Sequence, residues 1–190
     1  ILGTNTTSGS VTIDNGATLT LGTGGTSGLI AAGQAIHDNG TLAVNHSDAV
    51  TLAQLIDGTG GLSQIGAGKT TVTAADTYTG ATTITKGTLA LSGAGDISAS
   101  SGVHDNGVFD VSAATSAAPA IAALDGSGQV VLGGKTLTLT NANSTFGNIF
   151  SGVASSTGGL TVANGTEVLT GNNTYTGATT IGNGALLQLG

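Results

Sequence analysis

Apolar and polar residues alternate over many short runs of this chain. The clearest run is KTLTLTN, at positions 135–141, in which Leu137 and Leu139 alternate with threonines. A period of two residues places successive side chains on opposite faces of an extended strand. Because glycine and asparagine separate such runs throughout, the pattern predicts an all-β chain of many short strands.

Two segments depart from this pattern. Positions 50–56 fit either a strand or a short helix, and we expect a strand because the neighbouring segments are strands. The alanine-rich positions 113–124 allow either a helical turn or a loop excursion.

The tripeptide Asp-Asn-Gly precedes three of the alternating runs. It occurs in IDNGATLTLG from Ile13, in AIHDNGTLAV from Ala35 and in GVHDNGVFDV from Gly102. Asn tolerates the left-handed backbone region and Gly has no Cβ to obstruct it, so each copy predicts a tight turn that leads into a strand. His37 and His104 precede this turn in equivalent copies, and we interpret both as turn residues rather than as metal ligands or general bases.

An octapeptide, TYTGATTI, occurs twice without change, at Thr77–Ile84 and at Thr174–Ile181. A weaker copy lies at Ser144–Phe150, where Phe146 takes the place of the tyrosine. Such regular recurrence indicates an internal repeat. The copies, with the glycine-rich turns that lead into them, define repeat units at about 58–93, 126–152 and 157–190.

Tandem repeats of short strands are typical of a β-solenoid. One turn of such a coil cannot bury its apolar face alone, whereas stacked turns cover each other and form parallel sheets with strands about 4.8 Å apart. At roughly 20 to 25 residues per turn, the chain would make about eight or nine turns. A β-sandwich would not explain why the copies keep the same side chains at the same offsets. The predicted fold is therefore a single-stranded parallel β-helix that forms one domain, residues 1–190.

Charged residues are scarce and mostly acidic. The chain has ten acidic residues and three lysines, Lys69, Lys86 and Lys135, for a net charge of −7. Nucleic-acid binding needs many basic side chains to displace counterions from phosphates, which excludes that function. The absence of cysteine excludes a disulfide framework and thiolate metal sites. The longest apolar run, Ala117–Leu124, is interrupted by Pro119 and is too short to span a bilayer.

The segment Asn173–Ile181, followed by Gly184 and Leu186, resembles the passenger-associated transport repeat of autotransporters, the type V secretion proteins of Gram-negative bacteria. Thr77–Leu89 resembles the same repeat, with Asp76 in place of the leading asparagine. The third, weaker copy departs from the pattern because it lacks the Thr-Thr-Ile strand.

The resemblance implies a right-handed parallel β-helix that is secreted through the outer membrane and acts as a cell-surface stalk or adhesin. It also implies that an outer-membrane β-barrel translocator follows this region in the full-length protein, and that the repeat assists folding and secretion. Since the chain begins at Ile1 and ends at Gly190 in mid-pattern, we interpret it as a piece of a longer protein. The expected partner is an unknown ligand on a host or bacterial surface, or a second copy in homotypic self-association.

Enzymes built on a β-helix, such as polysaccharide lyases and hydrolases, are the main alternative. The lyases resemble one another in using a basic residue as proton acceptor, and this chain has no arginine. The hydrolases use paired carboxylates, and here no two acidic residues are neighbours in sequence. His46 is interpreted as a surface residue, and the glycine-rich Gly22–Gly28 lacks the aspartate of a calcium-binding nonapeptide. We therefore assign no catalytic, cofactor-binding or metal-binding residue.

Aromatic and threonine side chains suggest two further surfaces. Tyr78, Tyr175 and Phe146 could form an exposed platform for sugars, although we expect them to cover corners of the coil. The runs at Thr18 and Thr136–Thr140 resemble parts of an ice-binding face, but such a face needs outward threonine in nearly every turn. The sequence thus favours a non-enzymatic stalk or adhesin segment, with a carbohydrate-active enzyme and an ice- or surface-binding solenoid as alternatives.

Overall fold

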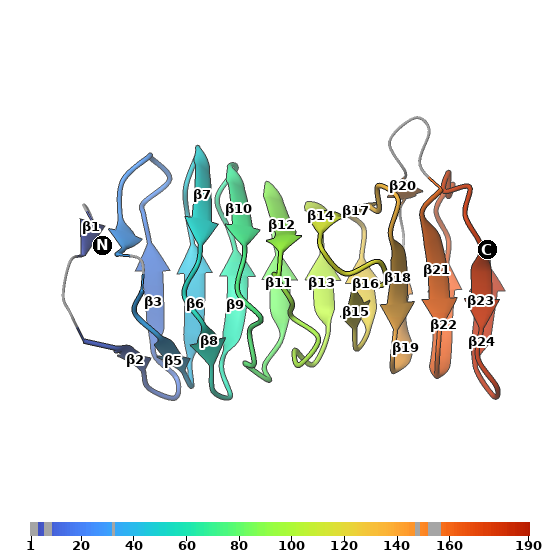
Figure 1. Cartoon of the computed structure of the whole chain (residues 1–190), viewed down its shortest axis with the longest axis horizontal. Helices are drawn as coiled ribbons and strands as arrows, with labels where there is room; N and C mark the ends of the chain where they lie inside the picture. Colours follow the sequence, from blue (N-terminus) through green and yellow to red (C-terminus); the bar gives the residue numbers. More distant parts are fainter. Residues whose placement is uncertain (1–3, 6–8, 32, 147–148, 152–156) are drawn as a thin grey trace.

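The structure, a computed structural model, describes residues 4–5, 9–31, 33–146, 149–151 and 157–190. In this part of the chain the strands stack into an elongated coil, and the two ends of the chain lie at opposite ends of it (Figure 1). No helix among these residues is long and apolar enough to cross a membrane. The prediction of an all-β solenoid is confirmed.

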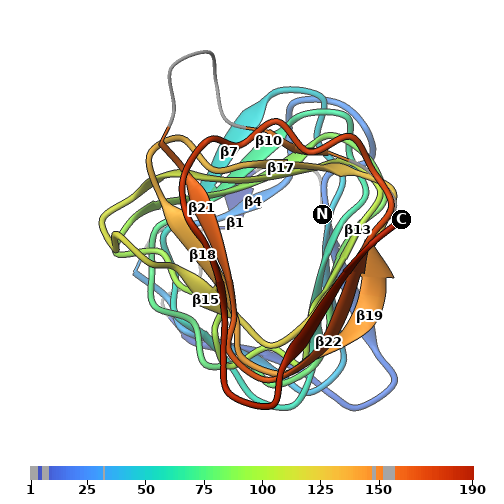
Figure 2. The ribbon, with the colours of Figure 1, turned by 90° about the vertical axis from the view of Figure 1, so that its right-hand side faces the viewer.

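Each turn of the coil passes through three faces, and each face is built from strands of successive turns (Figure 2). The first face holds a three-stranded and a four-stranded sheet: β2 (Val11–Ile13), β5 (Ile36–Asp38) and β8 (Ile56–Asp57), then β15 (Ala120–Ile121), β18 (Thr136–Leu139), β21 (Gly159–Val162) and β23 (Thr179–Ile181). The second face is one nine-stranded sheet: β3 (Thr18–Leu21), β6 (Thr41–Val44), β9 (Gly61–Gln64), β11 (Thr82–Ile84), β13 (Val103–Asp105), β16 (Leu124–Gly126), β19 (Ala142–Phe146), β22 (Gly165–Leu169) and β24 (Leu186–Leu189). The third face holds a two-stranded and a six-stranded sheet: β1 (Thr4–Asn5) and β4 (Leu29–Ile30), then β7 (Ala49–Leu52), β10 (Lys69–Val72), β12 (Thr88–Gly93), β14 (Val108–Ala114), β17 (Gln129–Val131) and β20 (Ile149–Ser151).

Strands of successive turns pair in parallel on all three faces. Leu42 lies beside Leu19 of the turn before, 23 residues earlier, and beside Leu62 of the turn after, 20 residues later. One turn therefore takes slightly more than 20 residues, as predicted. Seen from the C-terminal end, the chain runs anticlockwise while it advances toward the viewer, so the coil is right-handed (Figure 2).

Inward side chains of successive turns form continuous columns. On the third face Val50, Thr70, Leu89, Phe109 and Val130 lie one above another in register, and all five are buried. Full burial of one such apolar side chain stabilises the fold by about 1.5 to 3 kcal/mol. The columns therefore provide the cohesion that disulfides provide in many small domains.

The structure resolves the segments that the sequence left open. Positions 50–56 lie in β7, in the connection after it and at the start of β8, so the expected strand is confirmed. Positions 113–124 contain the end of β14, then β15 and the start of β16, with a loop and no helical turn between β14 and β15. Leu137 and Leu139 of β18 are both buried, which confirms the predicted alternation.

The two copies of the octapeptide lie on different faces of the coil. Thr82–Ile84 forms β11 on the second face, whereas Thr179–Ile181 forms β23 on the first. In both copies this strand stacks on an aliphatic strand of the preceding turn, with Thr82 beside Leu62 and Thr179 beside Leu160. The repeat is therefore defined by its contacts with the turn below, not by its position around the coil.

Replacing Leu62 by alanine is expected to lower the free energy of unfolding by about 2 to 5 kcal/mol, because this side chain is 1% exposed and a cavity would remain. Leu186→Ala is the matched control, since this leucine is 52% exposed and its truncation should cost less than about 0.5 kcal/mol. Urea unfolding followed by circular dichroism measures both effects. Equal losses in the two variants would argue against the buried column.

Candidate functional site

The two His-Asp-Asn-Gly segments fold into the same arrangement, which we name the clasp. The first clasp joins residues 37–40 of one turn to residues 57–60 of the next. His37 Nδ1 lies 2.6 Å from Asp57 Oδ1. Asn39 Oδ1 accepts hydrogen bonds from the backbone N–H and the hydroxyl of Thr59, at 3.2 and 3.1 Å. Two side chains of one turn thus hold two residues of the next.

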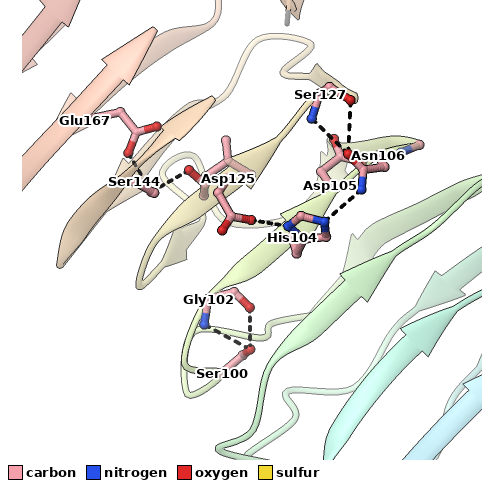
Figure 3. A network of polar contacts seen from close by, with 11 residues as sticks. Ser100, Gly102, His104, Asp105, Asn106, Asp125, Ser127, Ser144 and Glu167 are labelled. Atoms are coloured by element: carbon pink, nitrogen blue, oxygen red, sulfur yellow. Dashed lines mark hydrogen bonds and ion pairs between the residues drawn. The ribbon is translucent and has the colours of Figure 1, made fainter. Parts of the chain in front are cut away.

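The second clasp joins residues 104–107 to residues 125–128 with the same contacts (Figure 3). His104 Nδ1 lies 2.5 Å from Asp125 Oδ1, and Asn106 Oδ1 accepts hydrogen bonds from the backbone N–H and the hydroxyl of Ser127, each at 3.1 Å. The first clasp starts on the first face and the second clasp on the second face. The motif, like the octapeptide, is therefore not tied to one face.

The aspartate in the middle of each clasp points into the coil. Asp38 Oδ1 accepts a hydrogen bond of 2.9 Å from the backbone N–H of Gly40, and the residue is fully buried. Gly60 of the next turn passes so close that a Cβ there would overlap the Asp38 carboxylate, and Gly128 approaches Asp105 in the same way. Glycine is required at both positions because the backbone of one turn lies against a buried carboxyl of the other.

The interpretation of His37 and His104 as turn residues is wrong in position. Both lie within strands, β5 and β13, with exposed side chains that reach the next turn. The turn begins two residues later, at Asn39 and Asn106. His104 Nε2 lies 2.8 Å from Asn106 Nδ2, which can only donate, so Nε2 accepts and Nδ1 donates to Asp125. Because both ring nitrogens already have partners, this histidine is not poised to act as a general base.

The interpretation of His46 as a surface residue is also wrong. Its side chain is 1% exposed and lies beneath the glycine-rich corner that follows β3. Nδ1 lies 3.0 Å from Asp48 Oδ1, and Nε2 lies 3.3 Å from the carbonyl oxygen of Gly28. A Cβ on Gly22 would overlap the imidazole, so this glycine makes room for the ring. No local sequence pattern indicates this packing, because the glycine-rich corner that covers the ring belongs to the preceding turn.

The repeated tyrosine anchors a chain of hydrogen bonds inside the coil. The Tyr78 hydroxyl lies 2.7 Å from Thr82 Oγ1, which lies 3.0 Å from Ser100 Oγ of the next turn. Ser100 donates to the carbonyl oxygen of Gly80 at 2.8 Å. Since each hydroxyl has one proton, Thr82 donates to Ser100 and Tyr78 donates to Thr82. The chain satisfies three hydroxyls in the apolar interior.

The second copy keeps the first of these contacts, with 2.7 Å between the Tyr175 hydroxyl and Thr179 Oγ1. Tyr78 is 1% exposed, which excludes it from an exposed sugar-binding platform, and Tyr175 is partly buried against the core. The expectation that the tyrosines cover the coil is confirmed for these two. The side chain of Phe146 lies outside the described part of the structure.

Four acidic side chains are buried in the coil: Asp38, Asp76, Asp105 and Glu167. Burial raises the pKa of Asp76 and of Asp105 to about 7 and that of Glu167 to about 8, because the charged form loses its hydration. Backbone N–H groups that bond to Asp76 and Asp105 oppose the rise but do not cancel it. Each of the four carboxyls also has one oxygen without a hydrogen-bond partner in the described structure.

These carboxyls are poorly placed to catalyse the cleavage of a polysaccharide. They are at most 4% exposed, and a polymer bound outside the coil would not reach them. Over the described ranges, no group of three or more histidines and acidic residues could hold a metal ion. The buried acids therefore bear on the stability of the coil and not on an external substrate.

Pairing on the second face is sparse between β16 and β19, and we name this boundary the seam. These strands share one partner pair, Gly126 with Phe146, whereas β19 and β22 share five. A hollow of about 190 Å³ lies at the seam, and its lining includes His104, Asp125 and Ser144. The second clasp and the buried Glu167 lie on either side of this opening (Figure 3).

Replacing Tyr78 by phenylalanine is expected to lower the free energy of unfolding by about 0.5 to 1.5 kcal/mol, because Thr82 loses a donor in a buried site. Tyr175→Phe removes the same contact where water can replace it, so its effect should be smaller. Urea unfolding of both variants measures the difference. A larger loss for Tyr175→Phe would show that the buried chain of hydroxyls is not the stabilising feature.

Stability is expected to fall as the pH rises from about 4 to about 8, the range between the ordinary carboxyl pKa values and the raised pKa values of the buried acids. The pKa of Asp105 is raised to about 7 in the folded chain, so the folded state binds more protons than the unfolded state, and the stabilisation present in acid is lost as the pH passes through 7. Asp105→Asn should make the dependence of unfolding free energy on pH less steep below about pH 7, by the equivalent of up to one bound proton. Asp14→Asn, at an exposed position, is the control and should leave the slope unchanged. Urea unfolding at several pH values gives the slopes, and identical slopes in both variants would refute the assignment.

Comparison with known proteins agrees with this architecture. Residues 62–91 and 164–188 match the passenger-associated-transport-repeat family. The chain is 34% identical over 186 residues, 95% of its length, to "Adhesin BmaC autotransporter" of Brucella suis biovar 1 (strain 1330). It spans about 5% of the length of that curated relative. No solved structure gives a significant match. Both matched segments contain an intact copy of the octapeptide and the strands stacked around it, and the chain belongs to the autotransporter passengers with passenger-associated transport repeats.

Proposed function

We propose that this region is a non-enzymatic stalk and adhesive segment of an autotransporter passenger, secreted through the outer membrane to the surface of a Gram-negative cell. The observation that carries the proposal is the continuous parallel stack of the described strands, in which Asp38, Asp76, Asp105 and Glu167 are buried away from an external substrate. The name of the 34% identical relative, an adhesin autotransporter, supports an adhesive role. In the full-length protein an outer-membrane translocator would follow this region.

The outward surface suits contact with a ligand or with a second copy. Thr138, Thr161 and Thr180 lie in register on the first face, and Ser63 and Thr83 lie in register on the second. Such ladders present donors and acceptors at the regular spacing of the turns. The proposed partners are therefore a host or bacterial surface ligand and another copy of the same passenger.

The transport repeat also has a structure suited to assisting folding. Within residues 62–91, β11 stacks on β9 and β12 stacks on β10, so one repeat contains two pairs of stacked strands. It can cover part of its own apolar surface before the rest of the chain is in place. We assign this role to the units at 58–93, 126–152 and 157–190, and the coil would then grow from such units during secretion.

The adhesive role can be tested with beads coated with the folded chain. They should bind host epithelial cells or bacterial cells more than albumin-coated beads do, and free folded chain should compete for this binding. Analytical ultracentrifugation over a wide concentration range tests self-association in parallel. If folded chain binds neither cell type and remains a monomer, the adhesive role is wrong, and release of sugars from polysaccharides would favour an enzyme.

The folding role predicts where substitutions affect kinetics. Ile84→Val, inside a matched repeat, should cost about 1 kcal/mol and slow refolding about fivefold, because its contacts form early. Ile121→Val is the matched control, since Ile121 is equally buried but lies outside both matched segments. It should mainly speed unfolding. Stopped-flow measurements give the folding and unfolding rates of both variants. If the loss of stability is divided between slower folding and faster unfolding in the same way in the two variants, the repeat has no special role in folding.

A further inference from the structure

Glu167 occupies an unusual position, inside the second face next to the seam. Its neighbours in register are Ser144 on β19 and Leu187 on β24, and the residue is fully buried. The corresponding positions of earlier turns hold uncharged residues: Leu42, Leu62, Thr82, Val103 and Leu124. A carboxyl at such a position costs stability unless it makes specific hydrogen bonds.

The Ser144 hydroxyl contacts both sides of the seam. Its Oγ lies 2.6 Å from the carbonyl oxygen of Leu124 on β16 and 3.2 Å from Glu167 Oε2 on β22 (Figure 3). A serine hydroxyl has one proton, and the shorter contact, to a carbonyl that can only accept, takes it. The contact with Glu167 is then a hydrogen bond only if the carboxyl carries a proton and donates it to Ser144.

We propose that Ser144 and Glu167 form a proton-operated latch across the seam. With Glu167 protonated, its O–H donates to Ser144 Oγ, and Ser144 donates to Leu124, which holds β19 and β22 against β16. Loss of the proton leaves two acceptors competing for one hydroxyl proton, and the Ser144 bridge to Leu124 weakens. The seam then opens where the sheet has one partner pair in place of several.

The charges around Glu167 favour this behaviour. Burial raises its pKa to about 8, and repulsion by the nearby Asp125 carboxylate contributes a smaller part of this rise. Ser144 would lower the pKa of Glu167 only if its hydroxyl donated a hydrogen bond to the Glu167 carboxylate. The hydroxyl proton is instead used in the hydrogen bond to the carbonyl oxygen of Leu124. Asp125 is itself bonded to His104. The strands packed against Glu167, β19, β21 and β24, carry no titratable side chain.

The sign of the effect follows from the raised pKa. The folded state retains the Glu167 proton up to about pH 8, whereas the unfolded chain loses it near the ordinary glutamate value. The stabilisation by the latch is therefore complete below the ordinary glutamate pKa, declines as the pH rises above that value, and is lost once the pH has passed through 8. Between these two pKa values opening of the seam should increase about tenfold per pH unit, and above about pH 8 it should level off because both states have lost the proton.

Glu167 is the single glutamate of the chain, so ¹³C-labelled glutamate gives one carboxyl resonance to titrate. Its midpoint is expected well above 6. Hydrogen exchange, corrected for intrinsic rates, is expected to show about a tenfold loss of protection in β16 and β19 for each pH unit between about pH 6 and pH 8, and little further loss above that range. A midpoint near the ordinary glutamate value, or unchanged protection at the seam, would overturn the latch.

Three variants separate the latch from general stability. Glu167→Gln keeps the shape and can donate to Ser144 at every pH, so seam protection should no longer depend on pH. Ser144→Ala removes the bridge, so protection should already be low at pH 6. Asp105→Asn removes a different buried carboxyl and should leave the pH dependence of the seam intact.

If Glu167→Gln keeps the wild-type pH dependence, or Ser144→Ala keeps wild-type protection at pH 6, another group controls the seam. Glu167→Leu, which restores the apolar column, provides a folded reference without a titrating group.

Discussion

Each turn of this coil depends on the parallel register with the turn before it. Register places an inward side chain of one turn directly over its counterpart in the next, as in the column from Val50 to Val130. The same register aligns the backbone groups that pair between turns. Because a slip of one residue would turn every inward side chain outward, apolar cover and backbone pairing are lost or kept together. With few charges and no cysteine, the chain has no other large source of cohesion.

Polar contacts between turns fix this register at specific points. The two clasps tie the residues around a corner to the corresponding residues of the next turn, and the chain from Tyr78 through Thr82 to Ser100 does so inside the coil. Such contacts contribute modestly to net stability because they replace bonds to water. Their larger effect is selective, since a slipped register would bury their donors and acceptors without partners. The buried carboxyls select the native register in the same way, and their effect depends on pH because they can lose their protons.

The independence of the repeats from the faces has a physical explanation. All three faces consist of short parallel strands with one inward column or two, so a strand that fits one face fits another. A transport repeat needs the turn below it and the corner that its tyrosine covers, and any face provides both. Identical motifs can therefore recur on different faces. A rod built in this way presents related surfaces in several directions around its axis.

Local sequence determined much of this protein. The alternation at Leu137 and Leu139, the Asp-Asn-Gly turns and the repeated octapeptide established short strands, their parallel stacking and the length of a turn, because these depend on period and spacing. Only the tertiary structure decided which polar residues meet. His46 is buried by a corner of the preceding turn, His37 and His104 bond to aspartates about 20 residues away, and Ser144, which contacts Glu167, reaches Leu124 across the seam. Each of these contacts joins residues of different turns. The spacing of a sequence pattern gives the number of residues between two side chains, but it does not say whether those side chains point toward each other once the turns are stacked.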